Sequence, residues 1–255
     1  MLKKMVTKEG ENLQIYSKSR IRLNRLIAEA GITSRRKADE LIKSGVVKVN
    51  GKVVTKLGTV VSLDDLVTVN GKPIKLLKRY EYILLNKPKD TICTLKDEKG
   101  RKTVVDLVQT KSRVYPVGRL DRNTTGVLLL TNDGELANRL MHPRYQILRT
   151  YTVGLDKPLK VEHAKQIANG VEIDGVKFQK CELFIDFKDP KKVTITLTEG
   201  KNREIKRIFE HFGYEVKKLN RKMFANLTTS GLKRGEWRHL TKKEINMLRE
   251  LVGLL

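Results

Sequence analysis

The chain has 255 residues, which is enough for one large domain or two unequal domains with a substantial core. Its formal net charge of +24 exceeds what solubility requires and indicates a polyanionic partner. No apolar run approaches the roughly 18 residues of a membrane-spanning helix, and no signal peptide opens the chain, so nucleic acid is favoured over a membrane. Residues 1–79 carry 18 Lys and Arg against 7 Asp and Glu, and residues 80–255 carry 35 against 22, so both parts are expected to contact the polyanion.

Cysteine and histidine positions indicate no metal centre. Cys93 and Cys181 lie far apart in a spacing that fits neither a metal site nor a redox motif, and the four histidines are scattered. We therefore expect no metal, and we expect two buried free thiols in a reducing, cytoplasmic setting.

The first 79 residues predict a basic arm followed by a small helical unit. Residues 1–19 are polar and rich in Lys, without sustained periodicity, which favours a flexible arm or an unstructured start. From Arg20, apolar residues at helical spacing predict a first helix that ends at Gly31. Thr33 or Ser34 can cap a second helix.

Two hairpin signals follow these helices. Asn50-Gly51 lies between Val-rich runs, which predicts a tight β-hairpin, and Asn70-Gly71 repeats the pattern. Residues 67–79 end in a basic run and are interpreted as the connection between two domains.

Three cations, Arg35, Arg36 and Lys37, occupy the first turn of the second predicted helix, where the helix dipole favours acids. Each such cation costs about 0.3–1 kcal/mol at an exposed helix end. A bound phosphate would reverse this penalty, because helix-end N–H groups and basic side chains both attract anions. The alternative is a solvated run of charge whose dipole cost is screened by salt.

The loop Gly118-Arg119-Leu120-Asp121 is the strongest candidate for chemistry. Four consecutive apolar residues, Val127 to Leu130, follow the loop and predict a buried strand. Arg119 and Asp121 would therefore lie at the edge of a core, where an acid is held rigidly. Asp121 carries a negative charge at neutral pH, so it is a candidate nucleophile or base. The alternative is that Asp121 only stabilises a turn.

The remaining segments predict alternating strands and helices. A strand from Tyr80 to Leu85 is expected to end at Asn86-Lys87-Pro88, because Pro stops ladder pairing. Asn202 can cap the helix that follows it. Strands are expected at 149–153, 181–187, 193–198 and within 216–229, and helices at 135–141, 161–168, 203–212 and after Thr241, where Ile245, Leu248, Leu251 and Val252 are expected to point inward.

Extended motifs resemble those of a known enzyme family. Gly118-Arg119-Leu120-Asp121 followed by Thr124-Thr125-Gly126, Leu128-Leu129-Leu130 and Thr131-Asn132-Asp133-Gly134 resembles the catalytic motif of bacterial ribosomal RNA pseudouridine synthases of the RsuA/RluB branch. Leu85-Asn86-Lys87-Pro88-Lys89 is similar to the family's first catalytic-domain strand and turn, although the family commonly has Gly where Lys89 stands. The two helices and the Val-x-Val-Asn-Gly hairpin resemble an S4-type RNA-binding domain.

The resemblance implies roles for three residues at the reacting base. Asp121 would carry the reaction, by attack on the ribose or by proton abstraction from it, and Arg119 would fill the space that the base vacates. Tyr151 matches a tyrosine that stacks on the target base, a contact worth about 1–3 kcal/mol. The residue pattern alone predicts that Tyr151 is a core aromatic with a partner for its hydroxyl.

A second motif implies a cation beside Asp121. Glu199-Gly200-x-Asn202-Arg203-Glu204-Ile205-Lys206-Arg207 resembles the segment in which a Lys or Arg pairs with the catalytic Asp. By position this residue is Lys206, with the adjacent Arg207 as the alternative. Such a cation would keep the carboxylate charged and oriented. Arg203 and Arg207 are also expected to contact RNA.

An α+β enzyme is therefore expected, with an S4-like RNA-binding domain at 20–66, a linker at 67–79 and a mixed, largely antiparallel catalytic domain at 80–255. The resemblance implies that this monomer converts a uridine of ribosomal RNA, free or in an assembling subunit, to pseudouridine, with 23S rRNA favoured over 16S rRNA. The isomerisation needs no redox change and no energy donor, so no cofactor is expected. The alternative is a non-catalytic S4-type RNA-binding or ribosome-assembly factor, whose charge would suffice for salt-sensitive binding.

Overall fold

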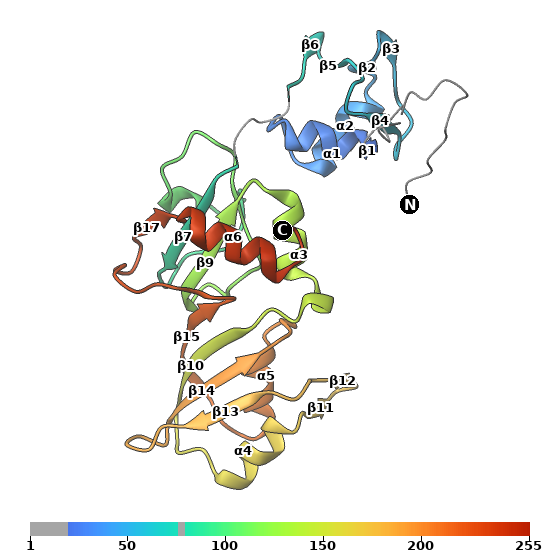
Figure 1. The fold of residues 1–255 in the computed structure, drawn as a ribbon. Coiled ribbons are helices and arrows are strands. Elements are labelled where there is room, and N and C mark those ends of the chain that lie inside the picture. The colour runs from blue at the N-terminus through green and yellow to red at the C-terminus, as the bar shows by residue number, and fades with distance from the viewer. Residues whose placement is uncertain (1–19, 76–79) are drawn as a thin grey trace, which may run out of the picture. The chain divides into compact units, whose positions relative to one another are not determined.

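The computed structural model describes residues 20–75 and 80–255, and the chain divides into the two units Met1–Lys78 and Arg79–Leu255. Both units combine helices with mostly antiparallel strands, which confirms the α+β class (Figure 1). The basic arm predicted at residues 1–19 and the end of the predicted linker, residues 76–79, lie outside the described residues. No helix of the described residues is long and apolar enough to cross a membrane.

The first unit packs two helices against short strands. Its elements are β1 (Arg20–Arg22), α1 (Leu23–Glu29), α2 (Arg35–Lys43), β2 (Val47–Val49), β3 (Lys52–Val53), β4 (Val60–Ser62), β5 (Val67–Val69) and β6 (Lys72–Pro73). The Ser34 side chain accepts a hydrogen bond from Lys37 N at 3.3 Å and caps α2, as its type and position predict. Arg25 and Glu29 form an ion pair of 2.7 Å along α1.

Both predicted hairpins form, and the second one moves a domain boundary. Asn50 and Gly51 adopt φ values of 49° and 80°, which a two-residue turn between twisted strands requires. Strands β5 and β6 pair with each other, and β5 also pairs with β2, so the hairpin at Asn70 belongs to a four-stranded sheet of the first unit. The linker predicted at 67–79 therefore begins too early, because β5 is held by ladder hydrogen bonds to β2, and β6 by ladder hydrogen bonds to β5.

The second unit is built on one large sheet. Its strands are β7 (Tyr82–Lys87), β8 (Tyr115–Pro116), β9 (Thr125–Thr131), β10 (Arg149–Leu155), β11 (Glu172–Ile173), β12 (Val176–Lys177), β13 (Glu182–Ile185), β14 (Lys192–Leu197), β15 (Val216–Phe224), β16 (Leu227–Thr228) and β17 (Trp237–His239). Its helices are α3 (Gly134–Met141), α4 (Val161–Ala168), α5 (Glu204–His211) and α6 (Lys242–Leu251), with short 3-10 turns at Val105–Leu107 and Pro143–Tyr145.

Strand order explains how the sheet brings distant segments together. The main order is β13-β14-β10-β15-β9-β7-β17, and the β15–β9 pair is parallel, whereas the other pairs of this sheet are antiparallel. Figure 1 shows α4 and α5 beside the half with β10, β13 and β14, and α3 and α6 beside the half with β7 and β9. The parallel contact between β9 and β15 joins the two halves.

Each half has its own hydrophobic core. Ile205, Ile208 and Phe209 of α5 pack with β10 and β14 in one cluster, and Leu136, Leu140 and Leu248 pack with β7 and β9 in another. The last helix differs from expectation at one position: Leu248 and Val252 are buried, but Leu251 is 51% exposed. Leu251 is the final residue of α6, where the helix ends and its side chain leaves the packed stripe.

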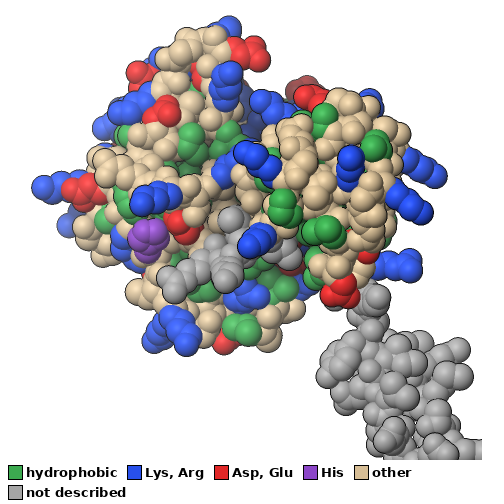
Figure 2. Space-filling model, turned by 90° about the horizontal axis from the view of Figure 1, so that it is seen from above, with side chains coloured by type: hydrophobic (Ala, Val, Ile, Leu, Met, Phe, Trp, Pro, Cys, Tyr) green, Lys and Arg blue, Asp and Glu red, His purple; other side chains and the backbone are tan. Residues whose placement is uncertain are grey.

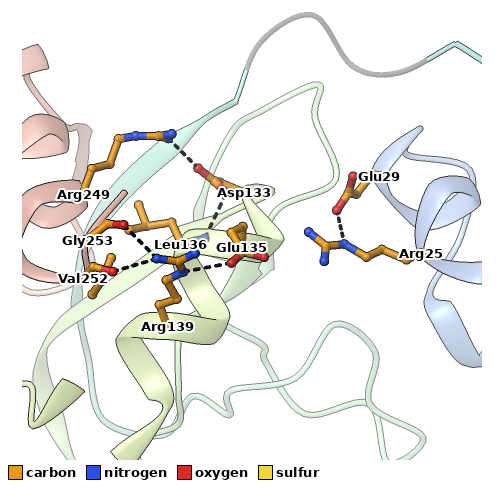
Figure 3. A network of polar contacts seen from close by, with 9 residues as sticks. All are labelled: Arg25, Glu29, Asp133, Glu135, Leu136, Arg139, Arg249, Val252 and Gly253. Carbon is orange, nitrogen blue, oxygen red and sulfur yellow. Dashed lines mark hydrogen bonds and ion pairs between the residues drawn. The ribbon is translucent and has the colours of Figure 1, made fainter. Parts of the chain in front are cut away.

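Polar contacts attach α6 to the sheet (Figure 3). Asp133 caps α3 by accepting a hydrogen bond from Leu136 N at 3.0 Å, and its other oxygen accepts one from Tyr82 and pairs with Arg249 of α6 at 3.2 Å. Arg139 of α3 donates to the carbonyl oxygens of Val252 and Gly253 at 2.9 Å each. These contacts satisfy the free carbonyls at the end of α6 and fix α6 to α3.

Gly126 makes the closest backbone approach between the two halves. A Cβ atom at this position would lie 2.1 Å from the Arg221 carbonyl oxygen, and its φ is +107°. We expect Gly126→Ala to lower the free energy of unfolding by about 2–5 kcal/mol, because both a clash and backbone strain result. Urea unfolding would measure this change. Gly118→Ala is the matched control, since Gly118 has φ +76° but nothing within 4 Å of its Cβ position. An equal loss in both variants would contradict the role of the close approach.

Candidate active site

The loop before β9 exposes Asp121 while its neighbours are anchored. Leu120 is buried, and its N–H donates to the Sγ of Cys93 at 3.3 Å. Thr124 N donates to the carbonyl oxygen of Asp121 at 3.0 Å and closes the turn. The Asp121 side chain remains 39% exposed. The loop therefore presents this carboxylate from a fixed backbone, which a catalytic group requires.

A buried lysine that the sequence did not single out holds this loop. Lys87 ends β7 and is fully buried, and its ammonium lies 2.9–3.1 Å from the carbonyl oxygens of Pro88, Asp121, Arg122 and Thr124. Three of these carbonyls belong to the loop that carries Asp121. The sequence does contain a signal for this burial. Lys87 continues an apolar strand up to Pro88, and residues of such a strand are buried.

The side chain of Lys206 pairs with Asp121. Its Nζ lies 3.0 Å from Asp121 Oδ2, which is the pairing expected from the motif resemblance. Arg207, the alternative cation, points elsewhere: it pairs with Asp174 at 3.8 Å and lies over the ring of Phe178. Successive helix residues lie about 100° apart, so α5 can present only one of the two cations to Asp121.

Asp121 and Lys206 open onto a cleft of about 1040 Å³ that lies entirely within the second unit. The cleft is lined by residues 92–97, 116–121 and 199–206 together with Thr124, Met141, Pro143, Arg101, Arg149, Tyr151, Leu197, Leu219, Arg221 and Phe224. Tyr151 is 9% exposed and belongs to the α5 core while it also borders the cleft. The position of Tyr151 is therefore compatible both with a core aromatic and with a residue that stacks on a base in the cleft.

The predicted RNA-contacting cations divide into three groups. Arg119 and Arg203 are exposed and line the cleft, whereas Arg207 does not line it. Arg35, Arg36 and Lys37 are exposed on the first turn of α2 in the first unit. Figure 2 shows Lys and Arg side chains spread over the visible surface, in keeping with the net charge of +24. This surface favours contact with a large polyanion.

The turn before α5 is closed by a carboxyl group and not by the predicted cap. Asn202 was expected to cap α5, but the cap position is Arg203, whose φ of 49° is left-handed and whose side chain makes no cap hydrogen bond. Glu204 closes the turn instead, because its Oε2 accepts a hydrogen bond from Lys201 N at 2.9 Å. Burial and the nearby Glu199 raise the pKa of Glu204 to about 7, against the effect of that hydrogen bond.

The Oε1 atom of Glu204 is buried without a hydrogen-bond partner within residues 20–75 and 80–255, and the negative charge of Glu199 also disfavours ionisation of Glu204. Glu204 therefore keeps its proton up to a pH of about 7. Between pH 4.5, the ordinary pKa of Glu, and a pH of about 7, the folded chain therefore binds more protons than the unfolded chain. The stabilisation that protonated Glu204 provides is lost as the pH rises through that window.

We expect Glu204→Gln to stabilise the chain at pH 8 by roughly 1–3 kcal/mol, because the amide can accept the hydrogen bond from Lys201 N without burying a charge. The gain should shrink as the pH is lowered toward 4.5, the ordinary value for Glu. Urea midpoints at pH 5 and pH 8 would measure both effects. Glu210→Gln, on the exposed side of the same helix, is the control. A Glu204→Gln difference that is the same at both pH values would contradict the raised pKa of Glu204.

Two helices packed on short strands, followed by a sheet that gathers an acid, an aromatic and a cation around one cleft, agree with the class of RNA-modifying enzyme that the sequence motifs resemble. The chain belongs to the RNA pseudouridine synthase family: the model described as RNA pseudouridylate synthase matches residues 81–211, and that of the S4 domain matches residues 21–67. These matches confirm the resemblance in the sequence, and the chain is a pseudouridine synthase, which is an isomerase.

Individual relatives agree along most of the chain. Ribosomal large subunit pseudouridine synthase B of Bacillus subtilis is 45% identical over 235 residues, covering 90% of this chain and 96% of that protein. Dual-specificity RNA pseudouridine synthase RluF of Escherichia coli is 41% identical over 236 residues, covering 92% and 80%. A crystal structure of a pseudouridylate synthase has a TM-score of 0.66 and 29% identity, covering 89% of this chain and 99% of that one.

Proposed function

We propose that this chain converts a uridine of ribosomal RNA, specifically of 23S rRNA, to pseudouridine, with Asp121 as the reacting carboxylate. The observation that carries the proposal is the contact of 3.0 Å between Asp121 and Lys206 in a cleft that Tyr151 also lines. The similarity to a large-subunit enzyme of Bacillus subtilis supports the 23S target. We further propose that the protein acts as a cytoplasmic monomer without a cofactor.

Each group in the cleft has a task in this reaction. The target base must leave its stack to enter the cleft, at a cost of a few kcal/mol when it is paired. Arg119 is exposed at the cleft and would occupy the space that the base leaves, and Tyr151 would stack on the base. Lys206 orients the Asp121 carboxylate toward the ribose. Arg203 adds a phosphate contact at the rim of the cleft.

Asp121 can break the bond between ribose C1′ and uracil N1 in two ways. Its carboxylate attacks C1′ and forms an ester while the base leaves with the electron pair, or it removes the C2′ proton and the ribose becomes a glycal. In the first route C5 of the base then bonds to C1′ while the ester bond to Asp121 breaks, and in the second C5 bonds to C1′ of the glycal while C2′ takes back its proton from Asp121. In both routes the C5 proton then leaves and N1 gains a proton. Atoms and electrons balance without an oxidant or an energy donor.

The S4-like unit would bind the backbone of the same RNA. Arg35, Arg36 and Lys37 lie exposed around the N-terminus of α2, whose free N–H groups add to the attraction for phosphate. This arrangement recognises the RNA backbone, so it supplies affinity and position but no choice of uridine.

Tritium release tests the function. Transcripts of 23S and 16S rRNA, labelled with tritium at C5 of uridine, would be incubated with the protein. We expect release from 23S rRNA and none from 16S rRNA. Release from 16S rRNA alone would overturn the proposed target. If neither free RNA releases tritium, the assay is repeated on ribosomal particles from cells that lack the protein, and the absence of release there would identify a non-catalytic RNA-binding factor.

A further inference from the structure

Arg221 is a buried cation on the strand that joins the two halves of the catalytic unit. It lies directly opposite Tyr151 of β10 and opposite Gly126 of β9, and it is 2% exposed. Its Nε donates to the carbonyl oxygen of Val127 at 2.8 Å, and its guanidinium lies over the ring of Phe224 at 4.9 Å. The strand pairing therefore fixes the guanidinium beside the segment that follows the Asp121 loop.

The charge of Arg221 has no counter-ion in the part of the chain that the structure describes. Among the described residues, no ion pair within 4.0 Å includes this side chain, and its Nη2 is buried without a hydrogen-bond partner. Burying a charge in this way costs free energy unless a partner is supplied. A side chain that is held at such a cost indicates a partner that arrives with the substrate.

The position of Arg221 places that partner in the active-site cleft. Arg221 lines the same cleft as Asp121 and Tyr151. Its charge also reaches Cys93: burial raises the pKa of that thiol, while the charges of Lys87, Arg221 and Arg119 act in the opposite direction. The inner part of the cleft is therefore electropositive, although Asp121 is the group expected to react there.

Bond cleavage creates a matching negative charge. When C1′ separates from N1, the electron pair stays on the uracil ring and spreads over N1 and the two carbonyl oxygens. This anion forms in both routes open to Asp121. A fixed N–H donor in a site shielded from water stabilises such a developing charge more than the neutral base.

We propose that Arg221 stabilises the departing uracil anion by donating an N–H hydrogen bond to one of its carbonyl oxygens, and this role rests on the proposed function. Arg221 keeps its proton throughout. The charge disappears when C5 bonds to C1′, the C5 proton leaves and N1 is protonated. Arg221 thus acts on the base, whereas Asp121 acts on the ribose.

A second buried arginine provides a matched control. Arg149 also lines the cleft and lies over the ring of Phe224, at 5.6 Å. Its terminal nitrogens are occupied, because they donate to the carbonyl oxygens of Ile147, Thr198 and Leu140 at 2.9, 2.9 and 3.3 Å. Arg149 therefore shares the burial of Arg221 but has its donors committed to the protein.

The experiment compares two leaving groups. RNA with uridine or 5-fluorouridine at the target position is incubated with excess enzyme, and loss of the target nucleoside is followed after digestion. Fluorine withdraws electrons and stabilises the uracil anion, so the fluorinated base depends less on Arg221. We expect Arg221→Gln to slow uridine conversion by about 10²-fold. The same substitution should slow 5-fluorouridine conversion by about tenfold or less. For each variant, the rate with uridine is divided by the rate with 5-fluorouridine. A partly unfolded preparation lowers both rates equally and does not change this ratio.

Two further variants make the outcome decisive. Arg149→Gln is expected to slow both substrates by the same factor. Arg221→Lys keeps the charge but loses the forked pair of donors, so its rate of uridine conversion is expected to lie between those of wild type and Arg221→Gln. This variant replaces Arg221→Gln in the comparison if Arg221→Gln does not fold. Equal slowing of both substrates by the Arg221 variants, with wild type active, would overturn this role alone. A wild type that converts neither RNA nor ribosomal particles would overturn the proposed function and this role with it.

Discussion

Asp121→Asn is expected to lower the isomerisation rate by about 10⁴-fold or more, the scale on which removal of a single reacting group acts. The amide has the same shape but can neither attack C1′ nor accept the C2′ proton. The fold should change little, since Asp121 is 39% exposed and its pair with Lys206 is partly screened by water. RNA binding should be retained, because the substitution removes a negative charge near a polyanion. Tritium release and filter binding on the same RNA would measure both quantities.

Asp97→Asn is the matched control for this result. Asp97 also lines the cleft, but its carboxylate is occupied by Arg101 at 2.7 Å and by the backbone N–H of Lys99 and Arg101. This change should leave the rate within a few-fold of wild type. Substantial activity of Asp121→Asn, within tenfold of wild type, would show that another group carries the reaction.

The sequence predicts the parts of the site that are local or that follow a family pattern. The loop at Asp121 and the strand after it are contiguous, so an apolar run and turn residues are enough to place them. The contact of Asp121 with Lys206 joins a loop to a helix far along the chain, and it was expected only because a second motif carried a cation at that position. No periodicity or spacing rule would have paired these two residues.

Other contacts depend on tertiary packing that a single sequence does not specify. Lys87 reads as a polar residue at the end of a strand, but the fold buries it under carbonyls that come 34 to 37 residues later in the chain. Asn202 has the preferred chemistry of a helix cap, but the left-handed backbone of Arg203 moves the start of α5 past it. Arg221 lies in a segment where the sequence predicts strand, and it is strand pairing that places its charge, buried, beside Tyr151. In each case the deciding partner is a distant backbone atom or the register of a neighbouring strand.

Lys87→Met is expected to destabilise the chain by about 2–4 kcal/mol, because it leaves buried carbonyl oxygens without their donor. The apolar side chain is close to Lys in length, so the change removes the ammonium with little loss of volume. Burial lowers the pKa of Lys87 to about 8, against the charges of Cys93 and Asp121, so the ammonium still predominates at pH 7. When the Lys87 ammonium is absent, its hydrogen bonds no longer hold the loop that carries Asp121 to β7. The rate should fall about 10²-fold, since a misplacement near 1 Å at the reacting group has that effect.

Urea unfolding and single-turnover tritium release would measure the two effects of Lys87→Met separately. Lys89→Met is the matched control, because Lys89 is two residues away and exposed. It should change neither the urea midpoint nor the rate at saturating RNA beyond the scatter of surface substitutions, about 0.5 kcal/mol. If Lys87→Met keeps the wild-type rate while its stability falls, the ammonium supports the fold without positioning Asp121. A loss of rate that persists well below the unfolding transition ties the position of the Asp121 loop to this one buried charge.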